Sequence, residues 1–322
     1  MLVTGGAGFI GSYLCEELLM RGHEVYALDN LSTGSMLNLE KAMESPRFHF
    51  QKGSVLERKM VLELTATCEI VVHLAAAVGV RLIVDKPLES LHTNIQGTEI
   101  VLEYANRFRK KIFIASTSEV YGRNSNIPLG EEDDRIYGST TISRWSYAGS
   151  KAMDEFFALA YHRTTHLPIV IGRFFNTVGP RQTGRYGMVI PRFVRQALKG
   201  EAITVYGDGS QTRTFTFVGD VARAVADLLF ESNAEGQIIN IGGEQEIGIL
   251  DLALMIKHLT NSSSEIRCIP LEEAYMEGFE DMQRRVPNIS KLKSIIQYTN
   301  TLALEQILAQ VIDYELSRKG LE

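Results

Sequence analysis

Short apolar runs rich in β-branched residues alternate along the first 240 residues with longer stretches whose apolar positions recur at helical spacing. The short runs predict strands at residues 2–4, 24–28, 47–51, 70–74, 111–115, 169–172 and 238–241. The longer stretches predict helices at residues 10–20, 90–108, 146–162 and 220–230. Because strands that alternate with helices form parallel sheets covered on both faces, we expect an α/β fold with a doubly wound, Rossmann-type sheet.

This alternation stops in two segments of the chain. Residues 177–213 combine glycines and prolines with a cluster of arginines, and beyond about residue 245 the sequence becomes helical and more polar. We predict that both segments belong to one smaller lobe, interleaved in sequence with the sheet. The expected division gives residues 1–176 and 214–243 to the Rossmann domain and residues 177–213 and 244–322 to the lobe, which suits a chain of 322 residues.

The composition narrows the classes of partner. A net charge of −6 offers no overall attraction to nucleic acid or to an anionic membrane surface. Three cysteines without short spacing suit a reducing compartment, and no run of about 18 apolar residues could span a bilayer. His162 and His166 have a spacing that could hold zinc, but no third ligand clusters with them, so we expect no metal. We expect a cytoplasmic protein that binds neither nucleic acid nor membranes.

A glycine-rich turn follows the first predicted strand at once and opens the first predicted helix. Its glycines stand at Gly5, Gly8 and Gly11, and Phe9 and Ile10 lie between the last two. Backbone without Cβ atoms can approach a pyrophosphate, whose charge the free N–H groups of a helix N-terminus receive. Asp29, at the end of the second predicted strand, is placed to bind ribose hydroxyls, which favours NAD over NADP. The alternative is a turn that only packs helix against strand.

A second group of residues has the chemistry of a proton acceptor. Tyr147 and Lys151 are four residues apart and project from one face of a helix. A neighbouring ammonium favours the phenolate and makes tyrosine a usable base. Thr117, Ser118 and Glu119 follow the fifth predicted strand, at the sheet edge where ligands of such folds bind. The alternatives are a chance pairing on a helix and a solvated strand-end loop.

These motifs, in this order, resemble those of the extended short-chain dehydrogenase/reductase family that modifies nucleotide sugars. The resemblance covers essentially the whole chain and implies NAD as cofactor, Tyr147 as the base at the sugar C4 hydroxyl, and a 4-keto intermediate. It places Lys151, Thr117, Ser118 and Glu119 in the catalytic site. The cofactor site that it implies comprises the glycine turn with Asp29, Asn30, Ser54, Val55, Leu74, Ala75, Ala76, Asn94, Tyr147 and Lys151. Ser54 stands where many members have an aspartate, which predicts a weaker contact to adenine.

The residues after Thr117 separate the reactions of this family. Its 4,6-dehydratases carry Asp-Glu where this chain has Ser118-Glu119, so the acid for dehydration is missing. The run from Thr117 to Gly122 resembles UDP-glucuronate decarboxylases, as do Arg144-Trp145-Ser146-Tyr147 and the segment 278–287. The last of these matches maps a catalytic arginine onto Arg285, expected to meet the substrate carboxylate or to donate a proton at C5.

The resemblance also implies a nucleotide-sugar site in the smaller lobe. Residues 181–213 contain six Lys or Arg against two acids, a local excess of positive charge suited to a diphosphate. For each arginine alone, a surface salt bridge is the alternative. The expected substrate-binding residues are Asn176, Arg181, Arg185, Val189, Tyr206, Arg213 and Arg285.

We therefore predict decarboxylation of UDP-glucuronate to UDP-xylose or its 4-keto precursor. A 4-epimerase of a UDP-hexose or UDP-hexuronate is the alternative, and a non-catalytic nucleotide sensor is a minor one. Apolar stripes mark the two helices that this family uses in dimerisation, and they predict a homodimer. The stripes consist of Leu91, Ile95, Leu102 and Ala105 on one helix and Met153, Phe156, Phe157 and Ala160 on the other.

Overall fold

The computed structural model describes residues 1–78, 86–184, 188–270 and 282–319. Within these ranges, seven strands form one parallel sheet in the order β11-β6-β5-β4-β1-β2-β3. The strands are β1 (Leu2–Thr4), β2 (Val25–Asp29), β3 (Phe48–Lys52), β4 (Ile70–His73), β5 (Lys111–Thr117), β6 (Ile169–Phe174) and β11 (Gln237–Ile241). The order sets β1 between β4 and β2 and reverses direction there, as in a Rossmann fold. The predicted fold class is confirmed.

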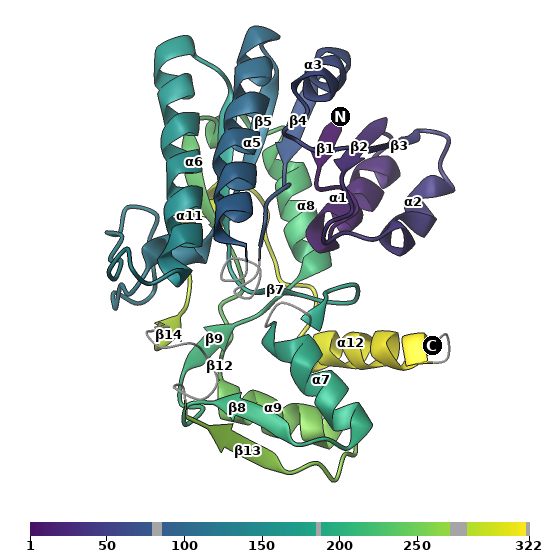
Figure 1. Cartoon of the computed structure of the whole chain (residues 1–322), viewed down its shortest axis with the longest axis vertical. Coiled ribbons are helices and arrows are strands. Elements are labelled where there is room, and N and C mark those ends of the chain that lie inside the picture. The colour runs from purple at the N-terminus through teal and green to yellow at the C-terminus, as the bar shows by residue number, and fades with distance from the viewer. Residues whose placement is uncertain (79–85, 185–187, 271–281, 320–322) are drawn as a thin grey trace.

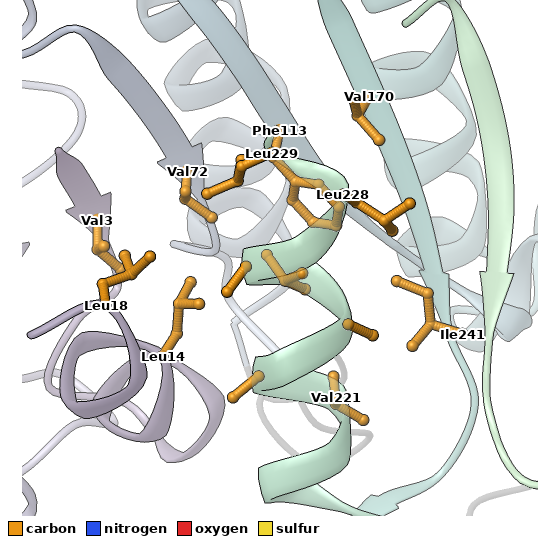
Figure 2. Packing of buried hydrophobic residues seen from close by; sticks show 14 of the residues in the cluster. Val3, Leu14, Leu18, Val72, Phe113, Val170, Val221, Leu228, Leu229 and Ile241 are labelled. Atoms are coloured by element: carbon orange, nitrogen blue, oxygen red, sulfur yellow. The ribbon is translucent and has the colours of Figure 1, made fainter. Parts of the chain in front are cut away.

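Alternate residues along each strand enter opposite cores because successive side chains point to opposite faces. Val72 and Phe113 pack under α1 (Phe9–Met20) and α8 (Val218–Leu228), as Figure 2 shows. Their neighbours Val71 and Ile112 enter the other core. That second core lies under α3 (Arg58–Thr67), α5 (Pro87–Arg107) and α6 (Arg144–Thr165).

The smaller lobe lies below the sheet in Figure 1. Its core draws on α7 (Val189–Lys199), α9 (Ile249–Leu259) and α12 (Leu304–Lys319). Three short sheets complete it or connect it to the Rossmann part. They pair β8 (Ile203–Tyr206) with β13 (Ile266–Ile269), β7 (Thr177–Val178) with β10 (Thr216–Phe217), and β9 (Thr212–Thr214) with both β12 (Glu246–Gly248) and β14 (Arg284–Arg285).

One helix near the C-terminus packs with the sheet rather than with the lobe. α11 (Ser290–Ile295) contributes Leu292 to the core over β11, together with Ile289 and Ile296. The expected division places all of residues 244–322 in the lobe. In the structure, however, α11 packs with the Rossmann part. The remaining helix and short turns are α2 (Glu40–Met43), η1 (Met36–Leu39), η2 (Ser118–Tyr121) and η4 (Ser232–Ala234).

Candidate active site

A cleft of about 1220 Å³ lies between the carboxyl edge of the sheet and the smaller lobe. Six strand ends of the sheet open into it: Gly5 after β1, Asp29 of β2, Gly53 after β3, Leu74 after β4, Thr117 of β5 and Phe174 of β6. Open parallel sheets bind ligands at this edge, where the strand order reverses. The topology alone therefore brings the predicted motifs into one space.

The glycine turn is shaped for close contact with a ligand. Gly5 has a φ of +72°, and a Cβ at Gly11 would stand 2.1 Å from the Gly5 carbonyl oxygen. A side chain at Gly11 would force the turn apart, whereas glycine leaves the backbone N–H groups at the start of α1 facing the cleft. Gly5, Gly8, Phe9, Ile10 and Gly11 all line it. The turn therefore fits the pyrophosphate of a dinucleotide.

Asp29 is fixed before any ligand arrives. Its carboxylate accepts hydrogen bonds from the backbone N–H groups of Ala7, at 3.0 Å, and Leu31, at 2.7 Å. Burial raises its pKa, while these N–H groups lower it. Asp29 and Asn30 both line the cleft, where carboxylate lone pairs suit ribose hydroxyls.

Of the other predicted cofactor residues outside α6, all but Asn94 line the cleft. Ser54, Val55, Leu74, Ala75 and Ala76 line the cleft, although the Ser54 hydroxyl also accepts a hydrogen bond from the backbone of Leu56, at 3.2 Å.

Asn94 differs from these residues, because it is buried and does not line the cleft. Its amide oxygen accepts from the Ala77 N–H at 2.7 Å, and its amide nitrogen donates to Ser150 Oγ at 3.2 Å. Asn94 therefore holds the lining segment in place from behind.

Tyr147 and Lys151 reach the cleft from the first turns of α6. The Tyr147 phenol shares a hydrogen bond with Thr117, at the end of β5. Burial raises the pKa of Tyr147, and the charges of Glu119 and Asp154 raise it further. The sequence-based expectation that Lys151 makes Tyr147 more acidic does not take Asp154 into account. Lys151 Nζ lies 2.6 Å from Asp154 Oδ2, so this ammonium is paired with a carboxylate.

Glu119 and Arg285 meet in the cleft although they are far apart in sequence. Arg285 Nη1 lies 2.7 Å from Glu119 Oε1. The pairing of β14 with β9 sets Arg285 beside Arg213, and both arginines line the cleft with Ser118 and Glu119. The lobe thus presents two neighbouring cations to the strand end that carries Thr117.

Not all members of the predicted arginine cluster lie at the cleft. Arg181, Arg192 and Arg213 line the cleft, whereas Arg195 forms two 2.8 Å hydrogen bonds with Glu315 of α12 and Lys199 ends α7. Arg185 and residues 278–281 lie outside the described residues.

Arg181 also faces α1. It lies 2.6 Å from Glu16, donates to Ser12 Oγ at 3.2 Å and covers the ring of Tyr13.

The remaining predicted substrate residues also lie at the cleft. Asn176, Val189 and Tyr206 line the cleft, and the Asn176 amide donates to the Thr214 carbonyl at 2.9 Å. Arg192 was considered only as part of the charge excess, yet its guanidinium lies 3.8 Å from the centre of the Tyr206 ring. Gln211 and Gln283, which belong to segments that resemble the family but were not named as site residues, also line the cleft.

Comparison with known proteins identifies this combination of glycine turn, strand-end hydroxyls and Tyr–Lys helix. Residues 1–242 match the NAD dependent epimerase/dehydratase family. The chain belongs to this family. Its enzymes are NAD-dependent and act on nucleotide sugars, and the residues around Gly11 and Asp29 suit that cofactor.

Relatives within the epimerase/dehydratase family extend over nearly the whole chain. A UDP-N-acetyl-alpha-D-glucosaminuronate decarboxylase of Bacillus cytotoxicus is 44% identical, covering 97% of this chain and 96% of that protein. UDP-glucuronic acid decarboxylase 1 of Danio rerio is 35% identical, covering 98% of this chain and 72% of that protein.

A solved structure of the family adds an epimerase to these relatives. The UDP-glucuronic acid 4-epimerase from Bacillus cereus, in complex with UDP-glucuronic acid and NAD, has a TM-score of 0.88 at 32% identity and covers 98% of this chain and 99% of that one.

Two other kinds of feature are absent from the described residues. No described helix has the length and apolar character needed to cross a bilayer. The same residues contain no group of three or more His, Cys, Asp or Glu side chains arranged to hold a metal ion. His162 Nδ1 instead donates a 2.8 Å hydrogen bond to the Leu167 carbonyl.

Proposed function

We propose that this enzyme decarboxylates a UDP-linked hexuronate through a 4-keto intermediate. With UDP-glucuronate the product is UDP-xylose or its 4-keto precursor. The observation that carries the proposal is the Arg285–Glu119 ion pair, at 2.7 Å, in the same cleft as Thr117 and Tyr147. A sugar that is neutral at C5 needs no guanidinium at this position, whereas a uronate carboxylate can take the place of Glu119 against Arg285.

Tyr147 begins the reaction by accepting the proton of the C4 hydroxyl. Thr117 orients the phenol through their shared hydrogen bond, and Lys151 supplies positive charge from the same helix. Bound NAD would supply the hydride acceptor for oxidation at C4. The glycine turn and Asp29 are placed to hold its pyrophosphate and ribose.

The C4 ketone makes the sugar a β-keto acid. The C5–C6 bond then breaks, its electron pair moves into an enolate across C4 and C5, and C6 leaves as CO2. Arg285 holds the carboxylate in the geometry for this step, and its guanidinium supplies the proton that enters at C5. Arg213, next to Arg285 in the sheet register, is left to bind the diphosphate.

The nature of the C2 substituent is best tested with two substrates. The relative with 44% identity is named for an N-acetylated uronate, and the relatives with 33–36% identity are named for UDP-glucuronate. The two substrates are UDP-glucuronate and UDP-N-acetylglucosaminuronate, each labelled with ¹³C at C6. Each is incubated with the enzyme and NAD, and the reaction is followed by NMR. Decarboxylation should give labelled CO2 and a UDP-pentose or its 4-keto form. Tyr147→Phe serves as the inactive control.

A 4-epimerase of a UDP-hexuronate is the second candidate. It is favoured by the structural similarity to an enzyme that inverts C4 of UDP-glucuronic acid. Retention of the ¹³C label in the sugar, with inversion at C4, would establish this candidate in place of decarboxylation.

We also propose a homodimer that forms through α5 and α6. Leu102 and Ala105 of the predicted stripes are buried in the core, but Phe156 and Met153 on α6 are 51% and 43% exposed, and Leu88 on α5 is 71% exposed. These side chains form the part of the helix pair that remains for a second copy. Light scattering should give twice the mass of the 36.0 kDa chain, and Phe156→Glu should reduce it to a single mass.

A further inference from the structure

Lys151 and Asp154 form an ion pair in the interior of the protein. The 2.6 Å separation joins side chains that are 4% and 0% exposed. Their spacing of three residues places them on one face of α6, with Asp154 one turn behind Lys151 as seen from the cleft. The proposed chemistry uses Tyr147 and Lys151 but assigns nothing to Asp154.

Asp154 ends a chain of buried polar groups that runs from β1 and β4 to α5 and α6. Thr4 Oγ1 lies 2.8 Å from His73 Nδ1, and His73 Nε2 lies 3.0 Å from Thr98 Oγ1. The Thr98 hydroxyl in turn stabilises the Asp154 anion. Burial lowers the pKa of His73 to about 3, so this imidazole is neutral and contributes hydrogen bonds rather than charge.

The charge on Lys151 therefore does not act alone. Glu155, the next carboxylate along α6, is already matched by Arg173 at 2.7 Å and by Ser116 at 2.5 Å. Asp154 is directed to Lys151 instead. A buried carboxylate with its partner ammonium forms a nearly neutral pair, whose effect on a neighbouring phenol is smaller than that of a free cation.

The groups that face Tyr147 come from several elements. Lys151 and Asp154 lie on its own helix, Glu119 approaches from η2, and Thr117 of β5 shares its hydrogen bond. Arg285 of β14 reaches this set through its ion pair with Glu119. Burial, Glu119 and Asp154 raise the pKa of Tyr147 in that order, and the bond to Thr117 lowers it.

We propose that Asp154 is a positioning residue for Lys151. It anchors the ammonium at the edge of the cleft and balances its charge, so that the strength of Tyr147 as a proton acceptor depends on the Lys151–Asp154 pair and not on Lys151 alone. This inference rests on the C4 oxidation of the proposed function but requires nothing of the later loss of CO2.

The variant Asp154→Asn separates charge from anchoring, because its amide oxygen still accepts a hydrogen bond from Lys151. The rate of NADH formation from UDP-uronate should keep its bell shape, with the acidic limb moved about one pH unit lower, since the unopposed ammonium favours the phenolate. The affinity for NADH, measured by fluorescence titration, should stay within about twofold. An acidic limb that stays in place or moves to higher pH overturns the proposal.

The variant Asp154→Leu removes both charge and anchor. NADH affinity should then fall about tenfold, because Lys151 loses the contact that holds it beside the cofactor. Asp154→Glu keeps a carboxylate at this position, so the acidic limb of its pH profile for NADH formation should lie where the wild-type limb lies. Unchanged NADH affinity in folded Asp154→Leu, checked by circular dichroism, contradicts the anchoring role.

A second pair of variants covers the case in which the Asp154 substitutions do not fold. Thr98→Val removes the hydroxyl that stabilises the Asp154 anion and should move the limb in the same direction by a smaller amount, while Thr98→Ser should restore it. An unmoved limb in Thr98→Val then overturns the proposal. If wild-type enzyme forms no NADH with either UDP-uronate, the proposed function fails, and NADH affinity still tests the anchor.

Discussion

The two sides of the cleft present their reactive groups in different ways. On the sheet side, Thr117 ends a strand and Tyr147 and Lys151 share one helix, so each position follows from a regular element. On the lobe side, Arg213 and Arg285 come from strands of three and two residues that are far apart in sequence and are brought together by backbone pairing. The sheet side suits the proposed oxidation at C4, and the lobe side suits the proposed recognition of anionic groups.

Loss of the Tyr147 hydroxyl is the most severe test of the sheet side. Tyr147→Phe should slow NADH formation by about 10³-fold, within the usual range for a removed general base. NADH affinity should change little, because the glycine turn and Asp29 remain. Stopped-flow absorbance with UDP-uronate measures the first quantity and fluorescence titration the second. A comparable loss in both would show that Tyr147 serves mainly to bind the cofactor.

The Glu119–Arg285 pair should separate the two steps of the reaction. Glu119→Gln and Arg285→His should each slow release of CO2 by about 10²-fold, the effect of losing a charged hydrogen-bond partner, while NADH formation falls less than tenfold. Labelled CO2 and absorbance at the NADH band report the two rates from one reaction. Equal losses in both rates would remove the proposed division between the sides of the cleft.

Arg213 and Arg195 provide a matched pair of arginines within the lobe. Arg213→Ala should weaken UDP binding by about 10–100-fold, since it removes a charge-assisted contact in the cleft. Arg195 pairs with Glu315 outside the cleft, so Arg195→Ala should leave UDP affinity within about twofold. Calorimetric titration with UDP decides between them, and equal weakening would indicate that the charge excess of residues 181–213 acts as a whole.

The smallest expected effect concerns the ion pair that joins β12 and β14, the two neighbours of β9. Arg284 of β14 pairs with Glu246 of β12 at 2.7 Å, chiefly lowering the pKa of Glu246 to about 2. A lowered carboxyl pKa adds stability above the ordinary value of about 4.5, which is lost as the pH falls towards 2. Glu246→Gln should therefore lower the melting temperature slightly at pH 6 and not at pH 2. A shift of equal size at both pH values would show that the charge is irrelevant.

The elements of the sheet side were largely visible in the sequence. Apolar runs located β1 to β6 and β11, and the spacing of the glycines and of Tyr147 and Lys151 reflects backbone geometry within a few residues. β5 extends to Thr117, two residues beyond the apolar run, because its hydroxyl residues continue the pairing with β6. Local periodicity was sufficient wherever one element supplies the whole feature.

On the lobe side, local sequence patterns were not sufficient to predict which residues meet in the cleft. β14 has two residues and therefore no periodicity, yet its register decides that Arg285 lies beside Arg213. Arg195 could be separated from the cleft arginines only by Glu315, which lies 120 residues later. Asp154 was missed for a different reason, because the Tyr147–Lys151 spacing was interpreted without the residue one turn further along the helix.

Arg181 has a mechanical consequence for the cleft. It extends from the loop after β7 to α1, where it contacts Glu16, Ser12 and Tyr13 at the helix whose first turn faces the cofactor site. Any outward swing of the lobe at this point must break an ion pair, a hydrogen bond and a cation–π contact together. Arg181 thus ties the lobe to α1, the helix proposed to bind the pyrophosphate. Movement of the lobe away from the sheet therefore pulls directly on the cofactor site.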